Sequence, residues 1–520
     1  MKIKAASWSN HPGRVQKRVL LSRKVLGRTF GVLTCAIVLV ACSTNSGQPQ
    51  ATTSSGSLSG HDQSGWVTHR GRWLVNANGQ VLMFHGVNLV LKDAPYYPSA
   101  FGFDAQYAQW LSSNGFDLVR LGVLASGEMP SPGVISSSYV GHIVDTVNLL
   151  ARFHIYVLLD WHQDDYGPYF GGDGMPNWMT LTNGQPDKQF AFPLDYTFNP
   201  ALQEAFQAFW NNQQVPGGKG LQDYYVEMLK AVASKVATNP WVIGYEVMNE
   251  PWPGTSWNKC TFGNGCPQLD ASELDPFYAR AAQAIRSVDS RHMIFLEPFV
   301  LFNFGGAPTH ISIPKGITNV GLAFHQYALS ASQAQQVFNN AIGWSSSTGG
   351  ALLNTEWSNS SSIPGVGGLD SIEAQENLED HNFMPFTYWV MNNCDIACSS
   401  NQYAAMFYNL KDPPTGLNVN TAVDMSLIRP EAMKLSGTPL STNYSGTTFA
   451  YAWSPVRSST STRYPIGSIS TFFMPKLIYP NGYSVSVSGP ARVVSPPDAQ
   501  VLEISQTDSG QSIGIEVLAK

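Results

Sequence analysis

Two glutamates have the residue type and the placement that cleavage of a glycosidic bond requires. Glu250 ends an apolar segment of sequence YEVMNE, and Glu356 ends another of sequence LLNTE. In glycosidic cleavage one carboxyl group protonates the leaving oxygen, while a second one attacks the anomeric carbon or activates a water molecule. We therefore predict that Glu250 and Glu356 face each other as a catalytic pair.

Such a pair needs a scaffold that brings distant strand ends together. Eight short apolar runs predict strands at 81–88, 117–123, 155–162, 242–250, 293–298, 320–327, 351–357 and 383–391. Amphipathic stretches separate them; in one, Tyr224, Met228, Val232 and Val236 recur every four residues, as one helix face requires. Eight strand–helix units predict an α/β fold, the (β/α)8 TIM barrel. A doubly wound sheet fits less well, because its Gly-rich phosphate turn is missing.

Polar side chains stand at nearly every predicted strand end. Because the loops at these ends form the active site of a TIM barrel, the polar side chains are candidate site residues. Glu246 is expected deeper in the barrel, paired with a cation or an amide, and Glu297 either beside the aglycone or on the rim. The strand ends carry Asn88, Arg120, Asp160, His162, Asn249, Glu250, Glu297, His325, Tyr327, Glu356, Trp389 and Asn392.

Taken in chain order, this set resembles glycoside hydrolase family 5 of the Asn-Glu-Pro barrel clan. The resemblance covers nearly all of residues 66–435 and rests on Arg120, His162, Asn249-Glu250-Pro251, His325, Tyr327, Glu356 and Trp389. It implies that Glu250 is the acid/base and Glu356 the nucleophile. It also implies that Arg120 and Tyr327 keep the nucleophile ionised and aligned. His162, Asn249 and His325 are then expected to bind the sugar, which stacks on Trp389.

Three segments resemble the endoglycoceramidase-like branch of this family. They are NEPWPG at 249–254, DWHQD at 160–164, and NLVLK at 88–92 followed by APY at 94–96. The resemblance implies that Lys92, Asp160 and Asp164 contact the glycan. A metal site formed by His162, Asp164 and His325 is a less favoured reading, and no metal or cofactor is predicted.

The resemblance implies a retaining β-glycoside hydrolase that cuts between a glycan and ceramide or a related lipid. The insertion at 167–220 supplies aromatic side chains for an apolar trough, although many of them are equally suited to packing. These are Trp178, Phe190, Phe192, Tyr196, Phe198, Phe206, Phe209 and Trp210. Two alternatives stay open: an endo-β-glucanase or mannanase acting on polysaccharide, and a non-catalytic carbohydrate-binding surface lipoprotein.

The amino terminus predicts export and lipid anchoring. Residues 1–28 are basic without an acid, and the apolar run from Phe30 to Ala41 is shorter than the about 20 residues that span a bilayer. It ends in LVAC, which resembles a bacterial lipobox. We predict a signal peptide at 1–41, a lipid on Cys42, and a flexible tether at 42–64. The protein is then expected at the bacterial cell surface, anchored to the membrane.

The remaining chain divides into a barrel at 65–435 and a small all-β sandwich at 436–520. Short alternating runs and hairpin signals such as Asn481-Gly482 predict the second domain. The close pairs Cys260/Cys266 and Cys394/Cys398 lack flanking histidines, so we predict two disulfides rather than a zinc site. A net charge of −6 without a basic block argues against a nucleic-acid partner.

Overall fold

The computed structural model describes residues 65–190, 192–261, 263–328, 330–358, 369–393, 404–508 and 510–520. The predicted signal peptide, Cys42, the tether and the pair Cys394/Cys398 lie outside the described residues. In the part of the chain that is described, no helix combines the length and the apolar character needed to cross a bilayer.

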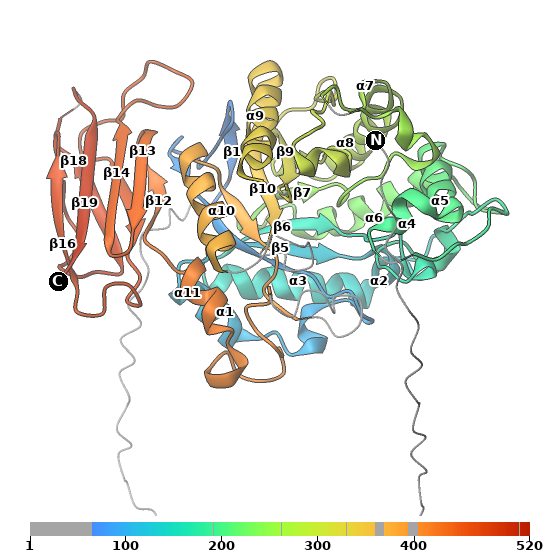
Figure 1. Cartoon of the computed structure of the whole chain (residues 1–520), viewed down its shortest axis with the longest axis horizontal. Helices are drawn as coiled ribbons and strands as arrows, with labels where there is room; N and C mark the ends of the chain where they lie inside the picture. Colours follow the sequence, from blue (N-terminus) through green and yellow to red (C-terminus); the bar gives the residue numbers. More distant parts are fainter. Residues whose placement is uncertain are drawn as a thin grey trace, which may run out of the picture. The chain divides into compact units, whose positions relative to one another are not determined.

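Eight parallel strands close into a barrel, which confirms the predicted TIM fold (Figure 1). All residues of these strands are buried, as expected for parallel strands that are covered on both faces. The strands are β4 (His85–Leu89), β5 (Leu118–Val123), β6 (Tyr156–Trp161), β7 (Val242–Glu246), β8 (Met293–Leu296), β9 (Val320–His325), β10 (Ala351–Trp357) and β11 (Phe386–Tyr388).

Amphipathic helices follow the strands and cover the barrel from outside. In α6, Tyr224, Met228, Val232 and Val236 are all buried, so the predicted stripe is the face that packs inward. The helices are α1 (Ala105–Ser113), α2 (Ala125–Glu128), α3 (Ser137–Arg152), α4 (Leu194–Phe198), α5 (Pro200–Trp210), α6 (Leu221–Val236), α7 (Pro267–Leu269), α8 (Asp275–Arg286), α9 (Ala331–Thr348), α10 (Leu369–Asn382) and α11 (Thr421–Leu427). Short 3-10 helices are η1 (Pro98–Phe101), η2 (Pro168–Phe170), η3 (Asn177–Met179), η4 (Gly254–Lys259), η6 (Val300–Phe304) and η7 (Gly416–Asn418), and η5 (Asp270–Leu274) is a short π-helix.

Two antiparallel sheets form the predicted all-β region near the carboxyl terminus. The first has the order β1 (Thr68–Arg70), β2 (Trp73–Val75), β3 (Val81–Leu82), β12 (Glu431–Leu435), β15 (Ile469–Phe473), β18 (Val501–Gln506) and β17 (Ala491–Val493). The second has the order β13 (Thr438–Ser445), β14 (Thr448–Ser454), β19 (Ile513–Ala519) and β16 (Tyr483–Ser488). The sheets pack through buried aromatic side chains; the rings of Trp453 and Phe472 lie 5.4 Å apart.

Three expectations about strands need correction. The predicted strand at 81–88 is two strands, because β3 leaves for the antiparallel sheet and only β4 enters the barrel. The strand predicted at 242–250 ends at Glu246, so Glu250 lies on the following loop. Finally, the first antiparallel sheet takes β1, β2, β3 and β12 from before residue 436, because their backbone groups pair with those of β15 and its neighbours.

Candidate active site

Glu250 and Glu356 face each other at the carboxyl end of the barrel. Glu356 lies on β10, and Glu250 lies four residues beyond the end of β7. One carboxylate oxygen of each, together with a ring nitrogen of His325, lie within 4.8 Å of one another. The Glu356 side chain is 9% exposed and the Glu250 side chain 12% exposed, so both carboxyl groups are largely buried. An approach of two oxygens this close favours direct attack by one carboxylate over an inverting pair, whose carboxyl groups stand about 6.5–9.5 Å apart to admit a water molecule.

Two donors hold Glu356 from different sides. Nη1 of Arg120 donates to Oε2 over 3.0 Å, and the hydroxyl of Tyr327 donates to Oε1 over 2.7 Å. Burial raises the pKa of the Glu356 carboxyl, while the charges of His325 and Arg120 act in the opposite direction. Both contacts favour the ionised carboxylate that attacks an anomeric carbon.

Arg120 is fully buried and is the centre of a larger network. Its Nε and Nη2 donate to the two oxygens of Glu246 over 3.0 and 2.6 Å. It also donates to Oδ1 of Asn88 over 2.9 Å and to Oδ1 of Asn249 over 2.7 Å. Although burial alone would raise it, the pKa of Glu246 is lowered to about 2 by Arg120. Glu246 is therefore paired deep in the barrel, as the sequence predicts.

The loop after β7 presents Glu250 in an unusual backbone conformation. Its φ is +41°, in the left-handed region that side chains other than glycine seldom adopt. Oε2 of Glu297 accepts the Glu250 N–H over 2.9 Å, and Nε2 of Gln163 donates to the carbonyl oxygens of Asn249 and Glu250 over 3.0 Å each. These three hydrogen bonds fix the main chain that carries the acid/base candidate.

The carboxyl group of Glu250 is held by two nitrogen atoms. Nδ2 of Asn303 donates to Oε1 over 2.7 Å, and Nδ1 of His325 lies 2.8 Å from the same oxygen. His325 is fully buried, so it contacts Glu250, the acid/base candidate, from the interior of the protein. We therefore interpret His325 as a positioning residue, rather than as the sugar ligand that the resemblance implies.

Glu297 lies at the end of β8, and the structure corrects both expectations for it. It is fully buried and faces the barrel interior, so it lines neither the rim nor the aglycone side. Its Oε1 lies 3.4 Å from Nε2 of His325. Burial raises the pKa of Glu297 well above its ordinary value, while the charge of His325 opposes this effect.

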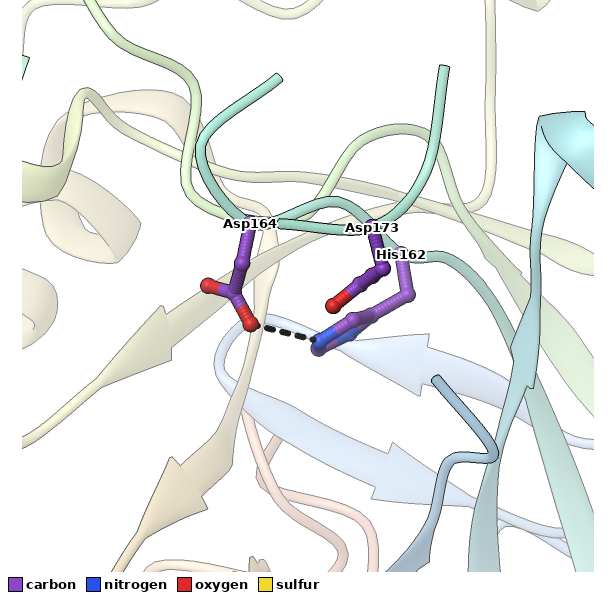
Figure 2. Close-up of side chains that lie close together, drawn as sticks. All are labelled: His162, Asp164 and Asp173. Atoms are coloured by element: carbon purple, nitrogen blue, oxygen red, sulfur yellow. Dashed lines mark ion pairs between the residues drawn. The ribbon is translucent and has the colours of Figure 1, made fainter. Parts of the chain in front are cut away.

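A second polar cluster lies beside the catalytic pair. Figure 2 shows His162, Asp164 and Asp173 converging, with Nε2 of His162 3.5 Å from Oδ2 of Asp164. The Lys92 ammonium contacts Asp164 and lies 3.6 Å from Asp173, so it supplies the positive charge among these carboxylates. Lys92 therefore interacts with both Asp164 and Asp173, two carboxylates that, by residue type and together with His162, could hold a metal ion.

The predicted sugar platform lies against this cluster. The His162 ring stacks on Trp389 at 5.4 Å between centroids, and the Lys92 ammonium lies 4.7 Å from the centroid of the same indole. His162 also contacts Oδ2 of Asp160 over 2.8 Å. Although burial opposes it, Asp160 raises the pKa of His162 to about 9. Lys92, His162, Asp164 and Trp389 are therefore gathered in one place, as a glycan-binding role requires.

Asp160 and Asn249 are placed differently from the expectation that they contact sugar. Asp160 is fully buried, with Oδ1 3.1 Å from Nη2 of Arg120. Asn249 is also buried, and its Nδ2 donates to the carbonyl oxygen of Gln163 over 2.9 Å while its Oδ1 accepts from Arg120. Both side chains are occupied within the protein, so in this state they position Arg120 and His162.

Sequence reasoning did not identify Asn303, Asp173 or Gln163. Asn303 lies on η6 and Asp173 within the sequence GGDG of the insertion, so neither stands at a strand end. Gln163 lies inside the segment DWHQD, but its role is to bind main-chain oxygens, which no sequence pattern indicates. The glycines flanking Asp173 were the one available signal, because a Cβ at Gly172 would meet the carbonyl oxygen of Asp164 at 2.0 Å.

The aromatic insertion separates into two groups. Trp210, Phe206 and Phe209 are buried against the barrel, which is the packing role that the sequence left open. By contrast Phe190, Phe192 and Phe198 are 44%, 59% and 54% exposed. Phe192 contacts Tyr196, whose ring lies 5.4 Å from Trp252, two residues beyond Glu250. Phe192 therefore connects to the catalytic loop through the rings of Tyr196 and Trp252.

The cysteine predictions can be followed for one pair. The sulfur atoms of Cys260 and Cys266 lie at disulfide-bonding distance, next to η4 and α7. The predicted partnership of Cys394 with Cys398 stays a prediction.

Two family models match this chain. The model of the cellulase family, glycosyl hydrolase family 5, matches residues 75–395. The model of the glycoside hydrolase family 5 C-terminal domain matches residues 429–517. Together they cover the barrel strands and most of the two antiparallel sheets.

Two curated relatives that are similar to this chain bear the name endoglycoceramidase. The endoglycoceramidase I of Rhodococcus hoagii (strain 103S) is 28% identical over 451 residues, which are 85% of this chain and 86% of the relative. The endoglycoceramidase of Hydra vulgaris is 31% identical over 285 residues, which are 49% of this chain and 53% of the relative.

Solved structures share the fold. The endo-glycoceramidase II from Rhodococcus sp., solved as a lactosyl-enzyme intermediate, matches with a TM-score of 0.67 at 22% identity and covers 86% of this chain and 100% of its own. A crystal structure of endogalactoceramidase matches with a TM-score of 0.65 at 20% identity, covering 88% of this chain and 100% of its own.

Proposed function

The chain belongs to glycoside hydrolase family 5, and we propose that it is an endoglycoceramidase-like retaining hydrolase of glycolipids. The proposal rests above all on the closeness of Glu250 and Glu356, whose nearest oxygens lie within 4.8 Å. Retaining enzymes hold their carboxyl groups about 5–5.5 Å apart so that one of them can reach the anomeric carbon.

The proposed reaction has two displacements. The Glu356 carboxylate attacks the anomeric carbon while Glu250 gives its proton to the glycosidic oxygen, and the bond to the lipid breaks with its electron pair on that oxygen. Glu250, now ionised, then takes a proton from water, whose oxygen attacks the anomeric carbon and releases Glu356. Arg120 and Tyr327 donate to the nucleophile. The family resemblance assigns Trp389 to stacking on the sugar ring, and its indole packs against His162 and Lys92.

The lipid part of the proposal has separate support. Two relatives that bear the name endoglycoceramidase share 28% and 31% identity with the aligned parts of the chain. The exposed side chains Phe190, Phe192 and Phe198 lie in the insertion that follows the sugar-binding cluster. Exposed aromatics beside an active site suit an aglycone with long hydrocarbon chains.

A glycolipid screen tests the substrate. Lactosylceramide dispersed in detergent should give lactose and intact ceramide by mass spectrometry, and E356A should release neither. Azide should restore turnover of an aryl glycoside by E356A, because a small anion fits the space left by the carboxylate. Release of monosaccharide alone, or hydrolysis of soluble cellulose in preference to the lipid, would contradict the proposal. The second outcome would favour a polysaccharide hydrolase, which is the activity that the family model's description names.

We also propose that the protein is exported and anchored by a lipid on Cys42. The basic segment at 1–28 and the sequence LVAC support this proposal. Metabolic labelling with a radioactive fatty acid should mark the protein, and C42S should abolish the label and move the protein out of the membrane fraction. Equal labelling of C42S would contradict it.

A further inference from the structure

Both hydrogen-bond contacts that described residues make with the carboxyl group of Glu250 end on the same oxygen. Asn303 donates from Nδ2 to Oε1 over 2.7 Å, and Nδ1 of His325 lies 2.8 Å from Oε1. A carboxyl oxygen has two lone pairs in its plane. If both nitrogens donate, the accepting capacity of Oε1 is filled.

The surroundings of His325 determine the direction of its hydrogen bond. Its Nε2 faces Oε1 of Glu297 at 3.4 Å and Oε1 of Glu246 at 3.9 Å, while Nδ1 also lies 3.9 Å from Oε1 of Glu356. Arg120 is a further cation in this cluster and contacts Glu246 and Glu356. Burial alone would lower the pKa of His325, but Glu297 and Glu356 raise it well above its ordinary value. Carboxylate oxygens thus face both ring nitrogens, an arrangement that favours an imidazolium whose Nδ1 donates to Glu250.

Local structure explains how Asn303 reaches the acid/base. Asn303 is fully buried on η6, and Gly305 ends this turn with φ +78°, where a Cβ would meet the carbonyl oxygen of Gln333 at 2.2 Å. The carbonyl oxygen of Asn303 accepts the N–H of Tyr327 over 3.0 Å. Its main chain is thus tied to the residue that holds the nucleophile, while its side chain is free to point at Glu250.

We propose that Asn303 is a positioning residue that, together with His325, fills Oε1 of Glu250 and so confines the transferable proton to Oε2. The inference rests on the proposed function, because it assigns Glu250 as the acid/base. In the first step the proton leaves Oε2 for the glycosidic oxygen as the bond from that oxygen to the anomeric carbon breaks. The carboxylate that results is stabilised at Oε1 by the two donors. In the second step a proton from water returns to Oε2.

Removal of the Asn303 amide tests the proposed role. N303L keeps the branching at Cγ and the main-chain contact to Tyr327, but it deletes one donor to the carboxylate. We expect the basic limb of the pH profile of kcat/KM to move upward by about one pH unit. We also expect kcat/KM to fall at least about tenfold for 4-methylphenyl β-lactoside, and to stay within about threefold for 2,4-dinitrophenyl β-lactoside, whose leaving group needs no proton.

A second variant distinguishes an effect on the Glu250 carboxyl group from a small loss of protein stability. The aspartate introduced in N303D places a carboxylate against Glu250, so its basic limb should lie above that of N303L. N199A serves as control, because Asn199 is a buried residue in the insertion whose Nδ2 donates to Asp187. N199A should change thermal stability without moving the limb.

The outcomes separate the two proposals. If the wild type hydrolyses both lactosides and the N303L profile coincides with the wild-type profile, the positioning role is overturned while the proposed function stands. If the folded wild type hydrolyses neither the lactosides nor lactosylceramide, the proposed function is overturned, and the positioning role with it. A basic limb of kcat/KM whose pH midpoint rises in the order wild type, N303L, N303D supports the inference.

Discussion

Arg120 and Glu246 form a two-point ion pair that is closed off from solvent on all sides. Nε and Nη2 of the guanidinium donate to the two carboxylate oxygens over 3.0 and 2.6 Å, and neither side chain is exposed. The same guanidinium reaches Glu356 through Nη1. Glu246 therefore aligns the cation that holds the nucleophile, although it lies too deep to touch a substrate.

Replacement of Glu246 by glutamine should lower the free energy of unfolding. E246Q leaves the charge of Arg120 without its main buried partner, and breaking such a pair typically lowers the free energy of unfolding by about 3–5 kcal/mol. Chemical denaturation measures this loss. The control is E227Q, because Glu227 pairs with Lys219 at the surface, where solvent screens the pair and the expected loss is much smaller. Equal effects of the two variants would contradict this reading of the network.

The Tyr327 hydroxyl should influence the pH at which the acidic limb of the kcat/KM profile lies. Glu356 must be ionised to attack, and burial already raises its pKa. Y327F removes a donor of 2.7 Å to this carboxylate, so the pKa rises further and the acidic limb of kcat/KM moves to higher pH, with about a tenfold loss at the optimum. In Y245F, which removes a hydroxyl bonded to Asp289 instead, the limb should stay in place.

Glu297 should act through the main chain of Glu250. Its Oε2 accepts the Glu250 N–H, and a glutamine at this position still offers a carbonyl oxygen to that N–H. We expect E297Q to retain kcat/KM within about tenfold and E297L to lose about a hundredfold or more, because E297L leaves a buried N–H unpaired beside a strained residue. Steady-state kinetics on an aryl lactoside compares them. A larger loss in E297Q than in E297L would assign the effect to charge instead.

Protein stability should depend on pH through His162. Its folded-state pKa of about 9 exceeds the ordinary value of 6.5. A group whose pKa is raised by folding contributes stability that is complete below the unfolded value and disappears as the pH passes the folded value. We therefore expect the free energy of unfolding to fall between pH 6.5 and about 9, and the slope to be flatter in H162Q. A wild-type curve that is level across this window would refute the assignment.

The exposed aromatics of the insertion should matter only for lipid substrates. Phe192 and Phe198 are more than half exposed, so their replacement by serine removes little internal packing. We expect the double variant F192S/F198S to lose about tenfold or more in kcat/KM on lactosylceramide in mixed micelles and to keep its rate on a soluble aryl lactoside. Equal losses on both substrates would indicate that these side chains stabilise the fold instead of contacting the lipid.

The sequence predicted the parts of this molecule that follow from periodicity. Strands such as β5, β6 and β10 were located within a few residues because their apolar runs are buried on both faces. The carboxyl ends of those strands then indicated Arg120 and Glu356 correctly as neighbours. A barrel makes this possible, since it converts strand order into spatial proximity at one end.

The depth of each side chain could not be predicted in the same way. Asp160, His325 and Glu297 occur at strand ends like true ligands, yet the structure shows them buried and committed to neighbouring charges. Asn303 was missed because η6 is a single turn whose position depends on Gly305 and on contacts with β9. Such roles arise from tertiary packing, which leaves no local periodicity to read.

The sheet that joins both ends of the chain has a consequence for biosynthesis. β3, near residue 81, pairs with β12, near residue 435, and the main chain of Leu352 in β10 donates to the carbonyl oxygen of Arg72. As the polypeptide emerges from the ribosome, β3 must wait until all eight barrel strands have been translated before its partner β12 exists. Until then its open edge is a template for wrong pairing. A stop codon ahead of residue 431 would leave the barrel complete in strand count but would yield a product prone to aggregate.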